Sequence, residues 1–336
     1  MEFSTWNKFL GYIKSQEEDE SVYGGTVLLA DFNILEEYKM LDKDKWKLAD
    51  IIDYIIISNP VLWAHYWLRN PQNPTEPMRL FRYQKNIVNC QHKYKLTRCG
   101  RQIGKTVCMT IDMLWRSMCI EHSKILYVAP YQSQVKVCFE DTMMKLIFDV
   151  PEIKNSIVKM PTHPYYQAIF KNGSEVKAMT AGTKSGQKGA GIRGISADCL
   201  YMDEVDFMGD SAIEAVSAVT AARPNARIWV SSTPSGKREN FYNWATERKS
   251  KFRCADCEKK HIEGTPFHYP SHVSPLFSSD VDDFFKASYT ESAYAHEILA
   301  EWGEELEGVF RHIDIDVCLS LGRRTIIPDD NVEESY

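Results

Sequence analysis

Residues 99–106, Cys-Gly-Arg-Gln-Ile-Gly-Lys-Thr, have the types and spacing of a loop that binds phosphate. They follow a predicted strand, Tyr94–Arg98, and begin a predicted helix, Lys105–His122, which is the context that such a loop requires. Backbone N–H groups at the start of a helix point at a bound anion, and the helix dipole favours its charge. Lys105 would add a positive charge beside the terminal phosphates, and the Thr106 hydroxyl would hold Mg²⁺. The segment therefore predicts a P-loop that binds and hydrolyses ATP.

This loop departs from the usual pattern at its first position, where Cys99 replaces the glycine and Gly100 follows one place later. Gly104 still allows the backbone to approach a phosphate closely. The alternative is a plain strand-to-helix turn with Lys105 exposed, and the order of strand, loop and helix favours the P-loop. The expected nucleotide contacts are Gly100, Arg101, Gln102, Ile103, Gly104, Lys105, Thr106 and Val107.

A second predicted strand, Cys199–Met202, ends in two carboxylates, Asp203 and Glu204. In an ATPase of this type the first carboxylate lies near Mg²⁺, and the second polarises the attacking water as general base. We therefore expect Asp203 on the metal side and Glu204 as the catalytic base. A solvated acidic turn after a strand is common, and the P-loop upstream is what favours the functional interpretation.

A third predicted strand, Ile228–Ser231, is followed by Ser232, Thr233 and Pro234. Polar groups at the carboxyl end of a strand face the ligand crevice of a parallel sheet. Here they would sense whether the γ-phosphate is present. A simple strand-to-turn transition explains the same residues equally well.

The remaining elements must position these residues. Short β-prone runs alternate with helical runs in the middle of the chain, which predicts an α/β fold with a mostly parallel sheet flanked by helices. The predicted division is a helical segment at 1–78, a core at 79–270, a second helical segment at 271–320 and an acidic tail at 321–336. Further expected elements are strands at Lys124–Ala129, Ala168–Phe170 and Glu175–Thr180, helices at Asp44–Ser58, Pro60–Leu68, Gln132–Phe148, Asp210–Ala222, Val281–Lys286 and Glu291–Glu305, and a connection at Asn70–Pro77.

The composition of the 336 residues is that of an ordinary globular protein, with 44% hydrophobic and 26% charged residues. The net charge of -6 argues against a dedicated sequence-specific DNA-binding domain, so any contact with nucleic acid would be a local patch. No apolar run approaches the roughly 20 residues of a membrane span, and no secretory leader is recognisable. The nine cysteines are expected to be reduced, in a cytosol-like compartment.

Four motifs follow one another along the chain: Pro60-Val-Leu-Trp63 with Arg82-Tyr-Gln84, the P-loop, Tyr201-Met-Asp-Glu204, and Ser231-Ser-Thr-Pro234. In this order they resemble the ATPase half of the large terminase subunit of tailed bacteriophages, over roughly residues 55–315. The resemblance implies a P-loop NTPase fold of the RecA/ASCE type with a small helical lid. It also implies a motor that hydrolyses ATP to move double-stranded DNA into a procapsid. The P-loop of that family lacks the usual first glycine, so Cys99 is expected there.

The resemblance implies further roles. Gln84 would contact adenine, although a polar residue on an exposed helix face fits nearly as well. Either Arg101 or Arg193 would be an arginine finger that stabilises transition-state charge. By the resemblance Arg193 acts across a subunit interface and Arg101 senses nucleotide in its own subunit; the alternative for Arg193 is a surface arginine in a flexible loop. The segment 232–234 would couple hydrolysis to subdomain motion, and the helical segments at both ends would pack together as a lid.

The partners implied are double-stranded DNA, the portal protein of the procapsid, the small terminase subunit and further copies of the chain in a ring, expected to be a pentamer. No membrane partner is expected, and the expected location is the host cytoplasm. Large terminases usually carry a C-terminal nuclease domain. Val309-Phe310 resembles the end of the motor region, and the roughly 26 residues that follow are too few for such a fold, so no nuclease activity is expected of these residues.

A zinc site is a separate hypothesis. Cys254 and Cys257 have the Cys-x-x-Cys spacing of zinc ligands, and His261 and His268 would complete a tetrahedral set. His272 competes for the same role, and the alternative is two reduced thiols in a polar loop.

Two other functions were weighed against a packaging motor. A helicase-like or remodelling ATPase acting on nucleic acid usually carries a second RecA-like domain, and about 100 residues after Pro234 are too few for one. A non-enzymatic nucleotide-binding scaffold would have lost some of Lys105, Thr106, Asp203 and Glu204, and all four are present. The motor remains the preferred hypothesis.

Overall fold

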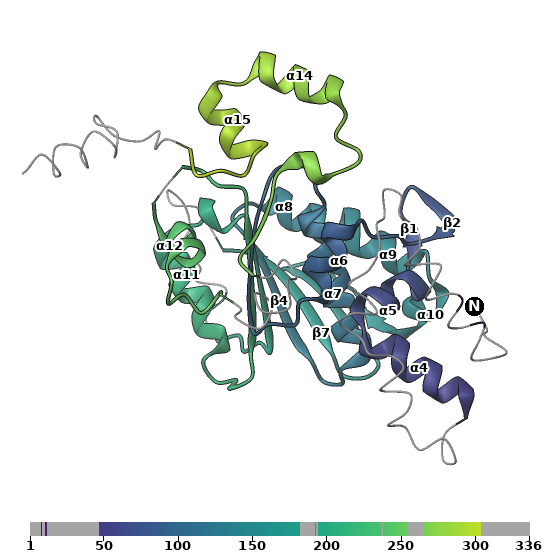
Figure 1. The fold of residues 1–336 in the computed structure, drawn as a ribbon. Helices are drawn as coiled ribbons and strands as arrows, with labels where there is room; N and C mark the ends of the chain where they lie inside the picture. Colours follow the sequence, from purple (N-terminus) through teal and green to yellow (C-terminus); the bar gives the residue numbers. More distant parts are fainter. Residues whose placement is uncertain are drawn as a thin grey trace, which may run out of the picture.

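The fold is built on one large sheet, seen in a computed structural model that describes Lys8, Gly11 and residues 47–181, 192, 194–236, 238–253 and 265–303. Six neighbouring strands of the sheet are parallel, as the alternation of strands and helices predicts (Figure 1). In spatial order they are β10 (Phe267–Tyr269), β3 (Tyr94–Cys99), β9 (Arg227–Ser232), β8 (Cys199–Asp203), β4 (Lys124–Ala129) and β7 (Glu175–Thr180).

Two antiparallel strands, β6 (Tyr166–Phe170) and β5 (Ile157–Lys159), extend the sheet beyond β7. The predicted connection at Asn70–Pro77 instead contains most of a small separate hairpin, β1 (Arg69–Asn70) and β2 (Asn73–Pro77). The proline-rich β2 is exposed throughout. Proline has no N–H to donate, and it is tolerated at an edge position because that side of the strand faces solvent and pairs with no further strand.

The larger helical layer covers one face of the sheet (Figure 1). Its apolar side chains pack against those of Tyr127 and Tyr201 in the sheet. The elements of this layer are α4 (Leu48–Ser58), α5 (Pro60–Trp67), α6 (Arg82–Asn89), α7 (Lys105–Cys119), α8 (Gln132–Lys136), the π-helix η1 (Val137–Met144), α9 (Lys145–Phe148) and α10 (Pro151–Ser156).

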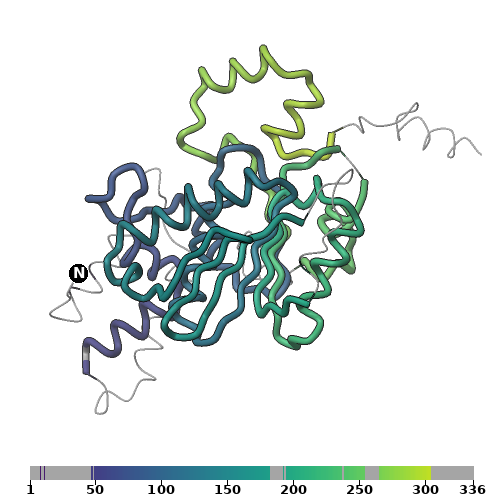
Figure 2. The backbone as a smooth tube through the Cα atoms, turned by 180° about the vertical axis from the view of Figure 1, so that it is seen from behind, coloured from purple at the N-terminus to yellow at the C-terminus, as the bar shows by residue number. Residues whose placement is uncertain are grey.

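The opposite face is covered by a smaller layer, visible from behind in Figure 2. Leu200 and Met202 of β8 point into this layer, whereas Tyr201 between them points to the other, because side chains alternate along a strand. The elements here are the short η2 (Val205–Phe207), α11 (Asp210–Ser217), η3 (Ala218–Thr220) and α12 (Asn240–Thr246).

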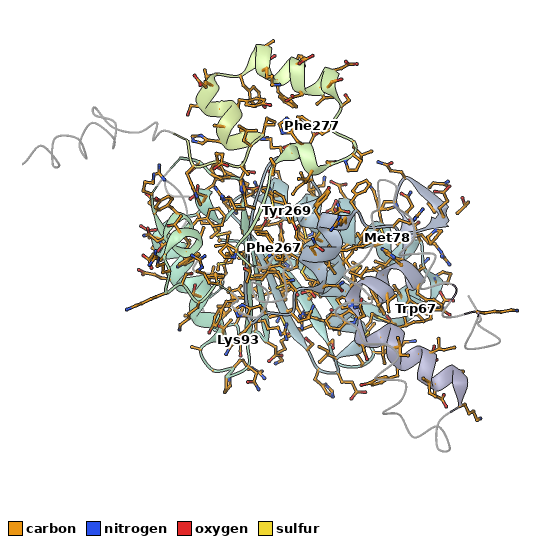
Figure 3. All side chains as sticks on the ribbon, in the orientation of Figure 1. Trp67, Met78, Lys93, Phe267, Tyr269 and Phe277 are labelled. Atoms are coloured by element: carbon orange, nitrogen blue, oxygen red, sulfur yellow. The ribbon has the colours of Figure 1, made fainter. Side chains whose placement is uncertain are left out.

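The last described segment lies beyond the carboxyl ends of the parallel strands. It contains η4 (Ser271–Val273), α14 (Ser279–Ser288) and α15 (Glu291–Glu297). Phe267 and Tyr269 of β10 are buried beside β3, whereas Phe277 lies outside the sheet with α14 (Figure 3). The segment therefore begins in the core and then leaves it.

The joint lid expected from the helical segments at the two ends does not appear in the described residues. Ile51, Ile52, Ile55 and Ile56 of α4 belong to the larger core, where α4 and α5 pack against α7. The pair α14 and α15 lies at the carboxyl edge, away from α4 and α5 in both views (Figures 1 and 2). The apolar face of α4 instead packs this helix onto the sheet layer. No helix in the described ranges is long and apolar enough to cross a lipid bilayer.

Candidate active site

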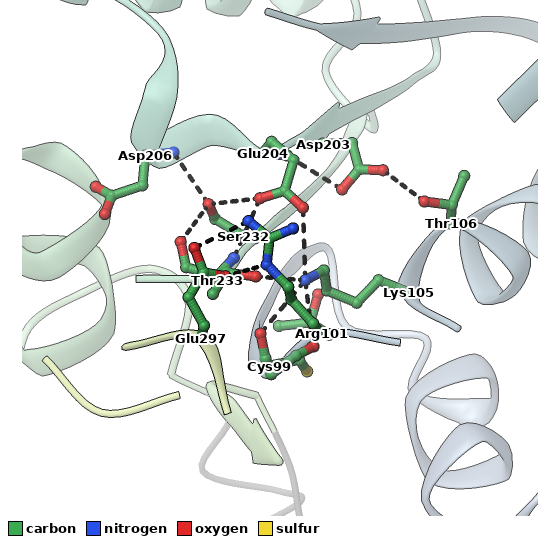
Figure 4. Close-up of polar contacts among 12 residues, drawn as sticks. Cys99, Arg101, Lys105, Thr106, Asp203, Glu204, Asp206, Ser232, Thr233 and Glu297 are labelled. Atoms are coloured by element: carbon green, nitrogen blue, oxygen red, sulfur yellow. Dashed lines mark hydrogen bonds and ion pairs between the residues drawn. The ribbon is translucent and has the colours of Figure 1, made fainter. Parts of the chain in front are cut away.

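Three of the four predicted motifs, namely the P-loop, the acidic pair and the turn after β9, meet at the carboxyl edge of the sheet (Figure 4). β9 lies between β3 and β8, so the turn after β9 stands between the P-loop and the acidic pair Asp203 and Glu204. A cavity of about 510 Å³ opens there, the size of a small-molecule site. Its lining contains Arg101, Gln102, Ile103, Gly104, Lys105, Thr106 and Val107, with Glu204, Thr233 and other residues.

The two glycines of the P-loop are required by close approaches of the backbone. Gly104 has φ +82°, a conformation that side chains other than glycine rarely adopt. A Cβ on Gly100 would lie 2.6 Å from Ile298 O and would also collide with the backbone of Ser271. Position 100 therefore requires glycine because the C-terminal segment packs directly on the loop.

Lys105 lies at the centre of the site and contacts three of its parts. Its Nζ donates to Thr233 Oγ1 at 2.8 Å and to the carbonyl oxygen of Cys99 at 3.3 Å. The same Nζ lies 3.5 Å from Glu204 Oε1 as an ion pair. The lysine thus joins the P-loop, the acidic pair and the turn after β9.

Thr106 and Asp203 form the expected metal-side pair. Thr106 Oγ1 donates to Asp203 Oδ2 at 2.9 Å, and the hydroxyl of Tyr127 donates to the same oxygen at 2.9 Å. Burial, followed by the neighbouring charge of Glu204, raises the pKa of Asp203 to about 6. Both effects disfavour the charged carboxylate, and a cation beside it would counteract them.

Glu204 adopts a left-handed backbone conformation, with φ +49°, directly after β8. The left-handed conformation raises the free energy of any residue that has a Cβ. Such conformations cluster at active sites. Glu204 Oε2 accepts hydrogen bonds from Thr233 N and Ser232 Oγ, both at 3.2 Å. The turn after β9 therefore contacts the predicted base itself, and Pro234 continues that turn.

Asp206 is a buried site residue that the sequence analysis missed. Its Oδ2 accepts from Ser235 N at 2.6 Å, and its own N–H donates to Ser232 Oγ at 3.3 Å. These bonds tie the turn after β8 to the turn after β9. The available signal was its position, two residues after Glu204 on the same edge.

Arg101 is paired with Glu297 of α15, another residue that the sequence analysis missed. Arg101 Nη2 donates to Glu297 Oε1 at 2.9 Å, Arg101 Nε donates to Glu297 Oε2, and the backbone N–H of Arg101 donates to Glu297 O at 2.8 Å. The arginine thus binds the C-terminal segment. Arg193 lies outside the described residues, so its role as a finger stays a prediction.

Gln84 contacts the P-loop and is not among the described residues that line the cavity. Its Nε2 donates to Ile103 O at 3.1 Å, and its Oε1 accepts from Phe81 N at 3.0 Å. Both ends of the amide are therefore engaged within the protein. The contact of Gln84 with adenine stays a prediction.

The cavity wall opposite the C-terminal segment comes from residues that follow β4. They are Tyr131, Gln134, Val137 and Thr142. The sequence analysis did not select them, although β4 ends at the edge where the other site residues lie. Tyr131 and Val137 are 47% and 48% exposed, so this rim of the cavity faces solvent.

The zinc hypothesis falls mostly outside the described residues, because Cys254, Cys257 and His261 are not among them. His268 Nε2 lies 3.0 Å from Leu299 O, and His272 Nε2 lies 3.0 Å from Asp282 Oδ1. Within the described ranges, no group of three or more His, Cys, Asp or Glu side chains is arranged to hold a metal ion. Zinc binding stays a prediction.

Solved structures of phage large terminases resemble this fold. The ATPase domain of the large terminase of Thermus phage P74-26 is 18% identical, with a TM-score of 0.52, over 68% of this chain and 94% of that one. The large terminase of bacteriophage HK97 is 16% identical, with a TM-score of 0.57, over 73% of this chain and 55% of that one. This chain thus spans little more than half of the HK97 protein.

A family comparison covers more than half of the chain. Residues 97–317, from the P-loop strand to beyond α15, match the family described as the terminase large subunit, T4likevirus-type, N-terminal. No curated protein matches the chain. The matched range contains the P-loop, the acidic pair and the turn after β9, and the chain belongs to the family of T4likevirus-type large terminase subunits.

Proposed function

We propose that this chain is the ATP-hydrolysing motor of viral DNA packaging. The observation that carries the proposal is the convergence of Lys105 and Thr106 on Asp203 and Glu204 beside one cavity. These groups supply a cation for phosphate, oxygen ligands for a metal ion and a base for water. P-loop ATP hydrolysis needs these three groups. The protein forms no covalent bond in the reaction, because its contribution is to position the reactants and to stabilise charge.

Lys105 would exchange its present partners for phosphate when ATP binds. Thr233 Oγ1 and the carbonyl oxygen of Cys99 are neutral acceptors, whereas a terminal phosphate carries full negative charge. The positive ammonium attracts an anionic phosphate more strongly than it attracts a neutral oxygen. The backbone N–H groups at the start of α7 would bind the same phosphates.

Thr106 and Asp203 would hold Mg²⁺. Both side chains offer oxygen atoms, which are the ligands that Mg²⁺ prefers. The pKa of the buried Asp203 carboxylate is raised, and a cation beside it would lower that pKa again. When bound, the ion supplies positive charge that neutralises the phosphate oxygens during transfer.

Glu204 would orient the attacking water and take its proton. Ser232 and Thr233 fix one carboxylate oxygen by hydrogen bonds, and the other oxygen lies nearer to Lys105. A carboxylate held in this way is positioned without being neutralised, which suits a general base.

The contacts between Glu204 and the turn after β9 would couple hydrolysis to motion. Loss of the γ-phosphate would change the charge around Glu204, and Ser232 and Thr233 would respond first. We propose that this drives double-stranded DNA into a procapsid. The motor would be a ring of copies, a pentamer on the portal protein, served by the small terminase subunit in the host cytoplasm. The family match supports DNA, the portal protein and the small terminase subunit as partners.

Replacement of Glu204 by glutamine tests the assignment of the base. The amide can still accept a hydrogen bond from Thr233 N, but it cannot take a proton from water. We expect ATP affinity, measured with a fluorescent ATP analogue, to stay close to that of the wild type. We expect phosphate release to fall by about 10²- to 10⁴-fold, the usual contribution of a general base.

The matched control is Glu214→Gln, which makes the same change on the exposed surface of α11. It should leave both binding and turnover unchanged. Turnover that persists in Glu204→Gln would contradict the assignment of Glu204 as the base.

A further inference from the structure

Tyr127 is a fully buried tyrosine whose hydroxyl reaches the metal-side carboxylate from inside the sheet. It lies in the middle of β4 and is paired in register with Tyr201 of the neighbouring β8. Its hydroxyl donates to Asp203 Oδ2 at 2.9 Å. The apolar run around Tyr127 marks it only as a core residue, and no step of the proposed hydrolysis uses its hydroxyl.

All the hydrogen bonds that Asp203 accepts in the described structure are accounted for by three donors. Oδ2 accepts the hydroxyls of Thr106 and Tyr127, and Oδ1 accepts the N–H of Glu204. A buried carboxylate depends on such partners because water does not reach it. Removal of one donor would leave Asp203 less firmly oriented.

The two hydroxyl donors differ in what holds them. Thr106 belongs to the P-loop helix and lines the cavity, so its surroundings change when a nucleotide binds. Tyr127 belongs to the central sheet between two parallel neighbours and lies outside the cavity lining. Tyr127 is therefore the donor whose position is set by the sheet and not by the nucleotide.

We propose that Tyr127 is a positioning residue for the divalent cation, acting through Asp203 without touching the ion. Its hydroxyl would keep the carboxylate aimed at the metal position while the P-loop binds and releases nucleotide. Partners that orient a metal ligand in this way typically change metal affinity or activity by 10- to 100-fold when they are removed. This inference rests on the proposed function, because it assumes that Asp203 serves Mg²⁺.

The variant Tyr127→Phe tests the inference, because it removes a single oxygen and keeps the buried ring. The probe is Mn²⁺, whose binding to the ADP-loaded chain is followed by electron paramagnetic resonance. We expect the Mn²⁺ dissociation constant to rise by about 10- to 100-fold. The Mg²⁺ concentration for half-maximal ATP turnover should rise similarly, while kcat at saturating Mg²⁺ stays near the wild-type value.

Tyr201→Phe is the matched control. Tyr201 is equally buried on the adjacent strand, and its hydroxyl also donates to a buried carboxylate, Asp112 Oδ2, at 2.5 Å. Asp112 lies outside the cavity lining. The control should lose a similar amount of stability and keep the wild-type affinity for Mn²⁺, which separates a metal effect from a packing effect.

Three outcomes would overturn the role of Tyr127: unchanged Mn²⁺ affinity in Tyr127→Phe, an equal loss in Tyr201→Phe, or a lower kcat that saturating Mg²⁺ does not restore. In each case a wild-type chain that hydrolyses ATP leaves the proposed function standing. A wild-type chain that neither hydrolyses ATP nor binds Mn²⁺ with ADP would contradict the proposed function, and this inference with it.

Discussion

At the scale of single residues, His65 is a buried group that makes stability depend on pH. Its Nε2 accepts a hydrogen bond from Leu80 N at 3.1 Å, which requires the neutral ring. Burial, with the nearby charges of Lys85 and Arg79, lowers its pKa from 6.5 to about 3. The unfolded chain therefore binds a proton more readily than the folded chain between these two values. The contribution of His65 is complete above pH 6.5 and is lost as the pH falls towards 3.

The variant His65→Gln tests this, because glutamine can accept the same hydrogen bond but does not titrate. Between about pH 7.5 and pH 5.5 the wild type should lose roughly 1.4 kcal/mol more unfolding free energy than the variant does. Urea denaturation at the two pH values measures the difference. Parallel losses in both proteins would show that His65 does not carry the dependence.

The local part of the site was predictable at this scale, and the long-range part was not. Lys105 and Thr106 are specified by a loop in which all the signals lie within a few residues. Arg101 and Glu297 are 196 residues apart, and Tyr127 and Asp203 are 76 apart. Such contacts depend on which strand lies beside which, and one sequence does not determine that order.

At the scale of elements, a buried ionic network joins α7 to β8. Asp112 of α7 pairs with Arg116 at 3.1 Å and accepts the hydroxyl of Tyr201. Lys95 of β3 is fully buried nearby, with its Nζ donating to Ile87 O. The Asp112 carboxylate balances part of the positive charge in this region.

Replacement of Asp112 by alanine should therefore cost about 3–5 kcal/mol of unfolding free energy, because it leaves buried cations without their partner. Urea denaturation measures the loss. Tyr201→Phe, which removes one hydrogen bond to the same carboxylate, should cost about 1.5–3 kcal/mol. A loss in Asp112→Ala no larger than that of Tyr201→Phe would contradict a balancing role for the carboxylate.

The bounds of the helices and strands agree closely with those predicted from the sequence where the hydrophobic pattern determines the element. The strands at Lys124–Ala129 and Glu175–Thr180 have the predicted bounds. The helix expected at Gln132–Phe148 contains the π-helix η1, and the strand Phe267–Tyr269 was not expected at all. A π-helix usually occurs inside an α-helix, so its residue types do not distinguish it from one. A three-residue strand is stabilised mainly by pairing with its neighbour, here β3, and so leaves no clear local signal.

At the scale of the whole molecule, the described part of the site contains no cation that is free to act on the transition state. The cations in the described cavity lining are Lys105 and Arg101, and Arg101 is bound to Glu297. The rim formed by Tyr131 and Val137 is exposed to solvent and accessible to a second copy. In a ring, a neighbouring chain would complete the site there, and Arg193 is the residue that we propose it supplies.

Mixing two inactive variants distinguishes a finger supplied by a neighbour from one supplied within the chain. Arg193→Ala keeps the base Glu204, and Glu204→Gln keeps the arginine, so a mixed ring contains interfaces with both groups intact. On random one-to-one assembly about a quarter of the interfaces have this composition, and phosphate release should recover accordingly. Mixing Arg193→Ala with the double variant Arg193→Ala/Glu204→Gln is the control and should restore nothing. If the first mixture is no more active than its two components measured separately, the arginine does not act across the interface.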